Sequence, residues 1–145
     1  MTRQLCTFHV GELYLGIEVE RIQEVLRGVA VTQVPKAPPE VHGLINLRGQ
    51  IVTAVSLRTV FGLPVDDRQH RPAMVVLDNG DELISLVVDR AGDVVTVRDD
   101  DFEEPPETLL NGARRLIRGA YKLEHRLLLV LDVGHIARFE TGGIA

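Results

Sequence analysis

The chain contains no tryptophan and only six other aromatic residues, two tyrosines and four phenylalanines, in 145 residues. Its apolar content of 45% is therefore mostly aliphatic, which predicts a core of valine and leucine side chains. Basic residues are also too few for a nucleic-acid surface, because 21 acidic residues outweigh 16 basic ones and the net charge is −5. Small β-proteins often bind nucleic acids, but they need an exposed aromatic and basic strand face. We therefore expect no nucleic-acid partner.

Cysteine, targeting segments and long apolar runs are equally scarce. Cys6 is the single cysteine, which excludes an internal disulfide and fits a reducing compartment. Residues 1–5 lack the apolar run of a signal peptide. The longest apolar run, residues 127–131, is far shorter than the ~20 residues of a membrane helix. These absences predict a cytoplasmic protein without direct membrane insertion.

No catalytic or metal-binding pattern is evident in the sequence. The histidines are scattered without the i, i+4 spacing of a helical metal site: His9, His42, His70, His125 and His135. Cys6 lies in an apolar, strand-like segment, where an inert buried thiol is the expected role; a thiol enzyme is the catalytic alternative. The acidic run 99–107 contains two prolines and no suitably spaced glycine, so we expect an exposed loop. The prediction is a non-enzymatic protein without metal or cofactor.

Alternating apolar and polar residues indicate about ten short strands, which favours an all-β barrel or sandwich. The expected strands are 4–10, 13–19, 23–27, 43–47, 50–55, 73–77, 82–88, 94–98, 116–121 and 126–131, and 29–34 is β-rich. An Asn-Gly pair predicts a hairpin turn at 78–81. A helical turn is expected at 56–61, and a short helix at 132–139 with Asp132 as its cap. Residues 63–72, with two prolines, are expected to link two halves.

The segment 41–52 is the most informative part of the chain. It follows a cluster of prolines and reads as a strand, a two-residue connection at Arg48-Gly49, and a returning strand. An Arg-Gly pair between two β-prone runs suits a hairpin whose second turn position needs a positive φ. From residue chemistry alone, a solvated turn residue is the favoured interpretation of Arg48, because arginines at turn tips are usually not functional.

This segment resembles the signature GxINLRGxIVPVxDLR of the CheW-like domain family of bacterial chemotaxis. The resemblance continues in order along most of the chain, through residues 15–25, 31–39, 86–89 and 127–132. The resemblance implies two five-stranded SH3-like β-barrels around a shared hydrophobic core, with short helices, in a single domain. The implied subdomains are approximately 12–66 and 71–140, with the termini exchanged between them.

The resemblance also implies function. No kinase or receiver segment follows in the sequence to Ala145, so the implied role is a stand-alone adapter. Such an adapter couples the cytoplasmic hairpin tips of chemoreceptors to the regulatory domain of a CheA-type histidine kinase. It is recruited to membrane-associated receptor arrays. An adapter of a non-flagellar chemosensory pathway is the alternative, because Thr53, Ser56 and Ser85 depart from the family pattern.

Site residues are carried over from the family by position. The implied receptor-binding residues are Glu24, Val25, Gly43, Asn46 and Arg48. Gly43 and Gly49 are also expected to serve backbone geometry. For the kinase, the barrel ends around Leu44 and Ile45, or around Gly119 and Tyr121, are expected to make the contacts.

Overall fold

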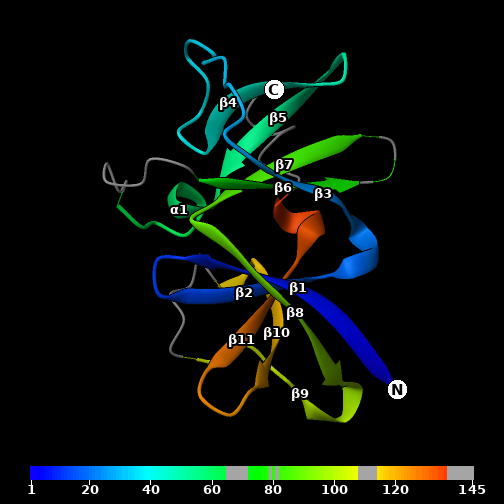
Figure 1. Cartoon of the computed structure of the whole chain (residues 1–145). Helices are drawn as coiled ribbons and strands as arrows, with labels where there is room; N and C mark the ends of the chain where they lie inside the picture. Colours follow the sequence, from blue (N-terminus) through cyan, green and yellow to red (C-terminus); the bar gives the residue numbers. More distant parts are fainter. Residues whose placement is uncertain (65–71, 79, 81, 108–113, 137–145) are drawn as a thin grey trace.

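Eleven strands form two hydrogen-bonded sheets in the computed structural model, which describes residues 1–64, 72–78, 80, 82–107 and 114–136. The two sheets lie one above the other, each curled into a barrel (Figure 1). The expected turn at 78–81, the linker 63–72 and the end of the helix at 132–139 lie wholly or partly outside the described residues. The predicted fold class, two SH3-like β-barrels around a shared core with short helices, is confirmed.

The first barrel has the strand order β8-β1-β2-β11-β10-β9. Its strands are β1 (Thr2–Val10), β2 (Leu13–Glu18), β8 (Arg90–Arg98), β9 (Phe102–Glu103), β10 (Ile117–Lys122) and β11 (Leu127–Leu131). The pair β2 and β11 is parallel, and the other neighbours are antiparallel. The two-residue β9 is thus added to five longer strands.

The second barrel has the strand order β3-β6-β7-β5-β4. Its strands are β3 (Ile22–Arg27), β4 (Val41–Leu47), β5 (Gln50–Ser56), β6 (Ala73–Asp78) and β7 (Leu83–Val88). The short helical segments are η1 (Val19–Arg21), α1 (Leu57–Val60), η2 (Asp99–Asp101) and a turn at 133–136. In this order β3 and β4 are the outermost strands, so the sheet hydrogen bonds leave them as its two edges.

The sheets divide the chain differently from the predicted boundaries of 12–66 and 71–140. The second barrel takes the continuous segment 22–88, and the first takes both flanking segments, 2–18 and 90–131. The reason is that β6 and β7, which follow the proline-containing segment, pair with β3 and β5 that precede it. The segment 63–72 therefore connects strands within one barrel.

Three apolar clusters explain why several strands are apolar on both faces. One fills the first barrel around Leu5, Tyr121 and Leu128, and one fills the second around Ile45 and Val76. The largest lies between the barrels and combines residues of both sheets. In β11, Leu128 and Val130 face the first-barrel interior while Leu129 and Leu131 face the shared core. A strand with two buried faces has no polar alternation, which accounts for the apolar run 127–131.

Three sequence-based expectations need correction. Residues 29–34 do not form a strand, and only Thr32 makes an isolated bridge, to Leu44. Strand β8 begins at Arg90 instead of 94, because Phe8 and His9 of β1 pair with Ala91 and Arg90. The acidic run 99–107 is not all loop, since η2 and β9 lie within it.

The helical predictions agree with the structure where it describes them. The Ser56 side chain caps α1 by accepting a hydrogen bond from the Thr59 amide. Asp132 Oδ1 accepts the amide hydrogen of His135 at 3.2 Å, as a cap of the turn at 133–136. Partial burial opposes ionisation of Asp132, but its backbone and side-chain hydrogen bonds to His135 outweigh this, so its pKa is lowered.

Ser85 of β7 provides a stability prediction. The whole residue is buried, and its hydroxyl has no hydrogen-bond partner among the described residues. An unsatisfied buried hydroxyl costs about 1–3 kcal/mol. Ser85→Ala should therefore raise the melting temperature by about 2–4 °C per kcal/mol recovered. Differential scanning calorimetry tests this expectation, with the half-buried Ser56 cap replaced as a destabilising reference. A lower melting temperature for Ser85→Ala would contradict it.

Candidate functional site

The β4–β5 hairpin turn holds Arg48 in an unusual backbone conformation. Both turn residues have positive φ, 50° at Arg48 and 88° at Gly49, whereas the sequence indicated this only for the second position. Two positive φ values are typical of a type I′ turn, whose twist matches that of the flanking strands. The Asn46 side chain supports the turn, because its Oδ1 accepts the Gly49 amide hydrogen at 2.8 Å. Asn46 thus has a local structural task within the predicted receptor site.

Arg48 forms a forked ion pair with Glu24 of β3. Its Nη1 lies 3.4 Å from Glu24 Oε2, and its Nη2 hydrogen-bonds to Glu24 Oε1. Because β3 and β4 are the two edges of the sheet, this pair bridges the opening that the backbone hydrogen bonds leave. The Arg48 side chain is 67% exposed and that of Glu24 is 24% exposed. A pair so exposed contributes about 0–1 kcal/mol to folding, so its carboxylate and guanidinium are available to a partner.

The other predicted receptor residues are arranged around this pair in different ways. Burial alternates along β3, so Val25 points to the opposite face of the strand from Glu24 and is 38% exposed. Gly43 has φ +155°, and a Cβ there would lie 2.4 Å from Val31 Cγ1 and 2.7 Å from the Thr32 carbonyl oxygen. Gly43 therefore allows residues 31–32 to lie against β4, which is a backbone requirement.

The predicted kinase-binding residues are divided between the barrels and are mostly buried. Leu44 and Ile45 lie on β4 of the second barrel, whereas Gly119 and Tyr121 lie on β10 of the first. Leu44 is half-buried, and the side chains of Ile45 and Tyr121 are in the barrel interiors. Burial raises the pKa of the Tyr121 phenol. A Cβ at Gly119 would lie 2.1 Å from Phe102 Cζ, so this glycine accommodates the approach of β9.

Sequence reasoning missed an ion pair that joins the barrels. Arg58 of α1 donates two hydrogen bonds to Asp89, Nε to Oδ1 and Nη2 to Oδ2, both at 2.8 Å. Asp89 Oδ2 also accepts the amide hydrogen of Gly11, in the β1–β2 turn, at 2.6 Å. The side chains are only 19% and 11% exposed. The signal in the sequence is a single carboxylate directly after the apolar run of β7, in a motif that the family resemblance also contains.

No metal site or membrane span emerges from the described ranges. Within them, no three histidine, cysteine, aspartate or glutamate side chains are grouped closely enough to hold a metal ion. None of the helices in the same part of the chain has the length and apolarity needed to cross a membrane. The arrangement offers exposed charged pairs and strand edges, which suit recognition of a protein partner.

Comparisons with known proteins agree with this arrangement. The CheW-like domain family matches residues 4–140. The chemotaxis protein CheW of Helicobacter pylori is 29% identical over 135 residues, covering 93% of this chain and 81% of that protein. CheW of Bacillus subtilis is 27% identical over 138 residues, covering 95% and 88%. Among solved structures, the scaffolding protein TtCheW of Thermoanaerobacter tengcongensis superposes with a TM-score of 0.82 at 22% identity, over 91% of this chain and 90% of that one.

Proposed function

Because this chain belongs to the CheW-like domain family, with chemotaxis scaffold proteins among its relatives, we propose that it couples chemoreceptors to a CheA-type histidine kinase. It acts by binding and not by catalysis. The observation that supports the proposal is the exposed, forked ion pair between Glu24 and Arg48. These two residues come together from positions 24 apart, at the place where the family resemblance implies receptor contact.

The proposed receptor surface combines this ion pair with exposed apolar side chains. A receptor tip is a helical hairpin, and an amphipathic helix docks by aliphatic contacts while charges fix its register. Ile51, which pairs with Asn46 across the hairpin, is 62% exposed. Val25 is 38% exposed on the other face of the edge strand β3, so it would contact the receptor only around that edge. Sequence reasoning did not single out Ile51. We assign it the role of an apolar contact beside Arg48.

In the proposed kinase contact, a barrel of this chain packs against a barrel of the kinase regulatory domain. The regulatory domain of the kinase would pack against one barrel end, around Leu44 and Ile45 or around Gly119 and Tyr121. Since Ile45 and Tyr121 are buried, their contribution is to the shape of the strand and not to direct contact. This arrangement leaves the Glu24–Arg48 pair to the receptor, and it recruits the protein to membrane-associated receptor arrays.

Reversing the charge of Glu24 should separate the two partners. In Glu24→Lys the lysine repels Arg48, so the forked pair is lost and the receptor meets two cations. We expect receptor binding to weaken by about tenfold or more, which is about 1.4 kcal/mol, and kinase binding to stay nearly intact. The measurement is a pull-down, followed by titration, with the cognate kinase regulatory domain and a soluble receptor hairpin.

Glu124→Lys is the matched control. Glu124 is 88% exposed in the β10–β11 turn, and its replacement by lysine changes the net charge by the same amount as Glu24→Lys. The control should bind both partners normally. If Glu24→Lys loses both partners while its circular dichroism stays native, separate surfaces are refuted. Absence of binding by the unaltered chain to either partner at tens of micromolar would refute the adapter function itself.

A further inference from the structure

The first barrel has two hollows that adjoin at one ion pair, between Glu18 and Arg118. One hollow has a volume of about 210 Å³ and the other about 280 Å³. Glu18, Arg118 and Val130 line both, so the two form one depression on either side of the Glu18–Arg118 pair. We call this depression the Arg118 groove.

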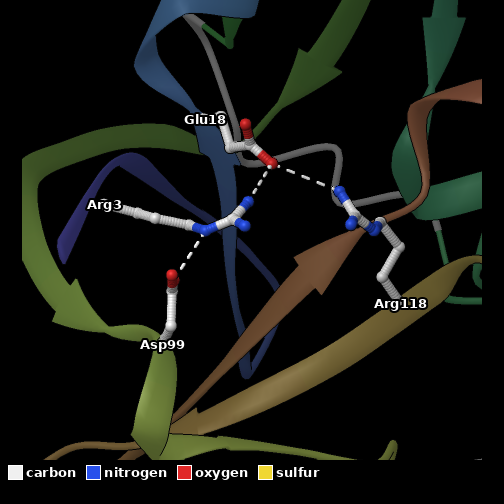
Figure 2. Close-up of polar contacts among 4 residues, drawn as sticks. All are labelled: Arg3, Glu18, Asp99 and Arg118. Atoms are coloured by element: carbon white, nitrogen blue, oxygen red, sulfur yellow. Dashed lines mark hydrogen bonds and ion pairs between the residues drawn. The ribbon is translucent and has the colours of Figure 1, made fainter. Parts of the chain in front are cut away.

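Arg118 is one of two cations in this groove whose guanidinium groups are incompletely paired. Its Nη1 lies 3.2 Å from Glu18 Oε1, and the same oxygen also accepts Arg3 Nη1 at 3.1 Å (Figure 2). One carboxylate oxygen thus serves two guanidinium groups. Arg3 has a second partner, since its Nε donates to Asp99 at 2.7 Å, and this contact raises its pKa. Arg118 makes one hydrogen bond among the described residues, unlike the forked pairs of Arg48 and Arg58.

A second cation lies on the same side of the groove. Arg21 of η1 lines the larger hollow with Arg118, and it forms no ion pair with any residue in the described ranges. The carboxylate of Asp132, which also lines this hollow, is occupied by the His135 amide and ring. The other carboxylate of this hollow is Glu18, whose Oε1 is already shared by Arg3 and Arg118. Arg21 and Arg118 therefore keep guanidinium N–H groups that neither carboxylate takes up. A forked guanidinium binds a carboxylate in a planar, two-bonded geometry.

The smaller hollow is lined by the charged residues Arg3, Glu18, Asp99 and Arg118, and it also has an apolar part. Leu5, Tyr121 and Val130 belong to the first-barrel interior and reach the surface here, and Phe102 is 41% exposed at the rim. A tyrosine is uncharged at neutral pH, and burial raises the pKa of Tyr121 further. An aliphatic side chain placed here would bury apolar surface against these groups.

We propose that the Arg118 groove binds an extended acidic peptide segment of a partner protein, with an aliphatic side chain in the smaller hollow and a carboxylate on Arg118 and Arg21. The two hollows adjoin, and same-face side chains of an extended peptide recur every second residue, roughly 7 Å apart. Each hollow is smaller than the ~300–1,000 Å³ of typical small-molecule sites, which favours recognition of single side chains. The groove is in the first barrel and the Glu24–Arg48 pair is in the second, so this site is additional to the proposed receptor surface.

The test titrates the isotope-labelled full chain with acetyl-Leu-Ser-Glu-amide and follows backbone amides by NMR. The amides of Val130 and Gly134 should shift saturably, with a Kd on the order of 1 mM, as suits two anchoring side chains. The matched peptide acetyl-Leu-Ser-Gln-amide should bind about tenfold more weakly, because it lacks the charge-assisted fork. Arg118→Gln should weaken binding of the acidic peptide by a similar factor.

Two further variants sharpen the result. Arg98→Gln removes a 71% exposed arginine of the same barrel outside the groove and should leave the affinity unchanged. Glu18→Gln removes the competing carboxylate from Arg118 and should raise the affinity severalfold, a direction that general loss of structure cannot produce. Native melting temperatures confirm that the variants are folded.

Three outcomes would overturn the proposal. The first is no saturable shift at Val130 or Gly134 up to about 10 mM peptide, tenfold above the expected Kd. The second is equal affinity for the glutamine peptide. The third is that sodium acetate alone reproduces the full affinity and shifts, which would assign the groove to free carboxylates and not to a peptide. None of these outcomes depends on the receptor or kinase.

Discussion

Asp89→Ala should lower the free energy of unfolding by about 3 kcal/mol, one of the two largest effects that we expect from a single substitution in this chain. The carboxylate accepts two hydrogen bonds from Arg58 and one from the Gly11 amide, and its side chain is 11% exposed. Alanine would leave the mostly buried guanidinium without this partner and the Gly11 amide without its acceptor. Removing one member of a buried pair costs more than the pair itself contributes, because the remaining charge stays buried after losing its carboxylate. Arg58 keeps its hydrogen bond to the Pro64 carbonyl oxygen at 2.7 Å, which does not replace the lost negative charge.

The Arg58–Asp89 ion pair lies where the two barrels meet, so its loss should affect more than the immediate surroundings of Asp89. Arg58 belongs to α1 beside the second barrel, and Gly11 belongs to the β1–β2 turn of the first. Asp89 lies between β7 and β8, where the chain passes from one barrel to the other. The Asp89 amide also donates to the His9 carbonyl at 2.9 Å. We therefore expect Asp89→Ala to loosen the contact between the barrels as well as the turn.

Urea unfolding of the single and double variants tests this expectation. Arg58→Ala and Asp89→Ala should each destabilise the chain, and the double variant should be less destabilised than their sum by about 1–3 kcal/mol. Asp89→Asn, which keeps the size but not the charge, should have an intermediate effect. Lys122→Ala is the exposed control, since Lys122 is 76% exposed and 3.6 Å from Glu103. Additive effects of Arg58→Ala and Asp89→Ala would mean that the pair does not act as a unit.

Local patterns in the sequence were sufficient for most of the secondary structure. The strand at 13–18, the Arg48-Gly49 connection, the helical turn after Ser56 and the Asp132 cap each depend on neighbouring residues, and the structure has all of them. Errors arose where a distant segment determines the conformation. Gly92 lies between the expected strands 82–88 and 94–98, but in the structure it belongs to β8, and a Cβ there would lie 2.5 Å from Thr7 Oγ1 of β1, so it is a glycine of close strand approach. Such a requirement has no local signature.

The site shows the same limit. The family resemblance supplied Glu24 and Arg48 as residues of one surface, and the structure brings them into contact because the sheet curls its two edges together. The resemblance did not predict that Asn46 would be engaged by the turn or that Val25 would face away from Glu24. The pairing of Arg58 with Asp89 depends on how the barrels pack, which strand periodicity does not encode.

Replacing Gly49 should lower the stability of the protein, whereas replacing Arg48 should leave stability unchanged and reduce receptor-dependent function. Gly49 has φ 88°, and a β-branched residue there costs about 1–3 kcal/mol in strain. Gly49→Val should therefore lower the melting temperature by roughly 2–4 °C per kcal/mol and weaken every interaction together. Arg48 already has φ 50°, a conformation that costs a residue with a Cβ roughly 1–2 kcal/mol.

Arg48→Gly removes both that backbone strain and the guanidinium, and the lost ion pair is worth only about 0–1 kcal/mol. The melting temperature should thus stay unchanged or rise slightly, while receptor-dependent activation of the kinase falls by about tenfold or more. Arg48→Lys should not restore full activation, because a lysine provides a point charge in place of the planar fork to Glu24. The measurements are calorimetry and a reconstituted kinase assay with receptor fragments. If Arg48→Gly melts as low as Gly49→Val, Arg48 holds the hairpin together and its assignment to the receptor surface is refuted.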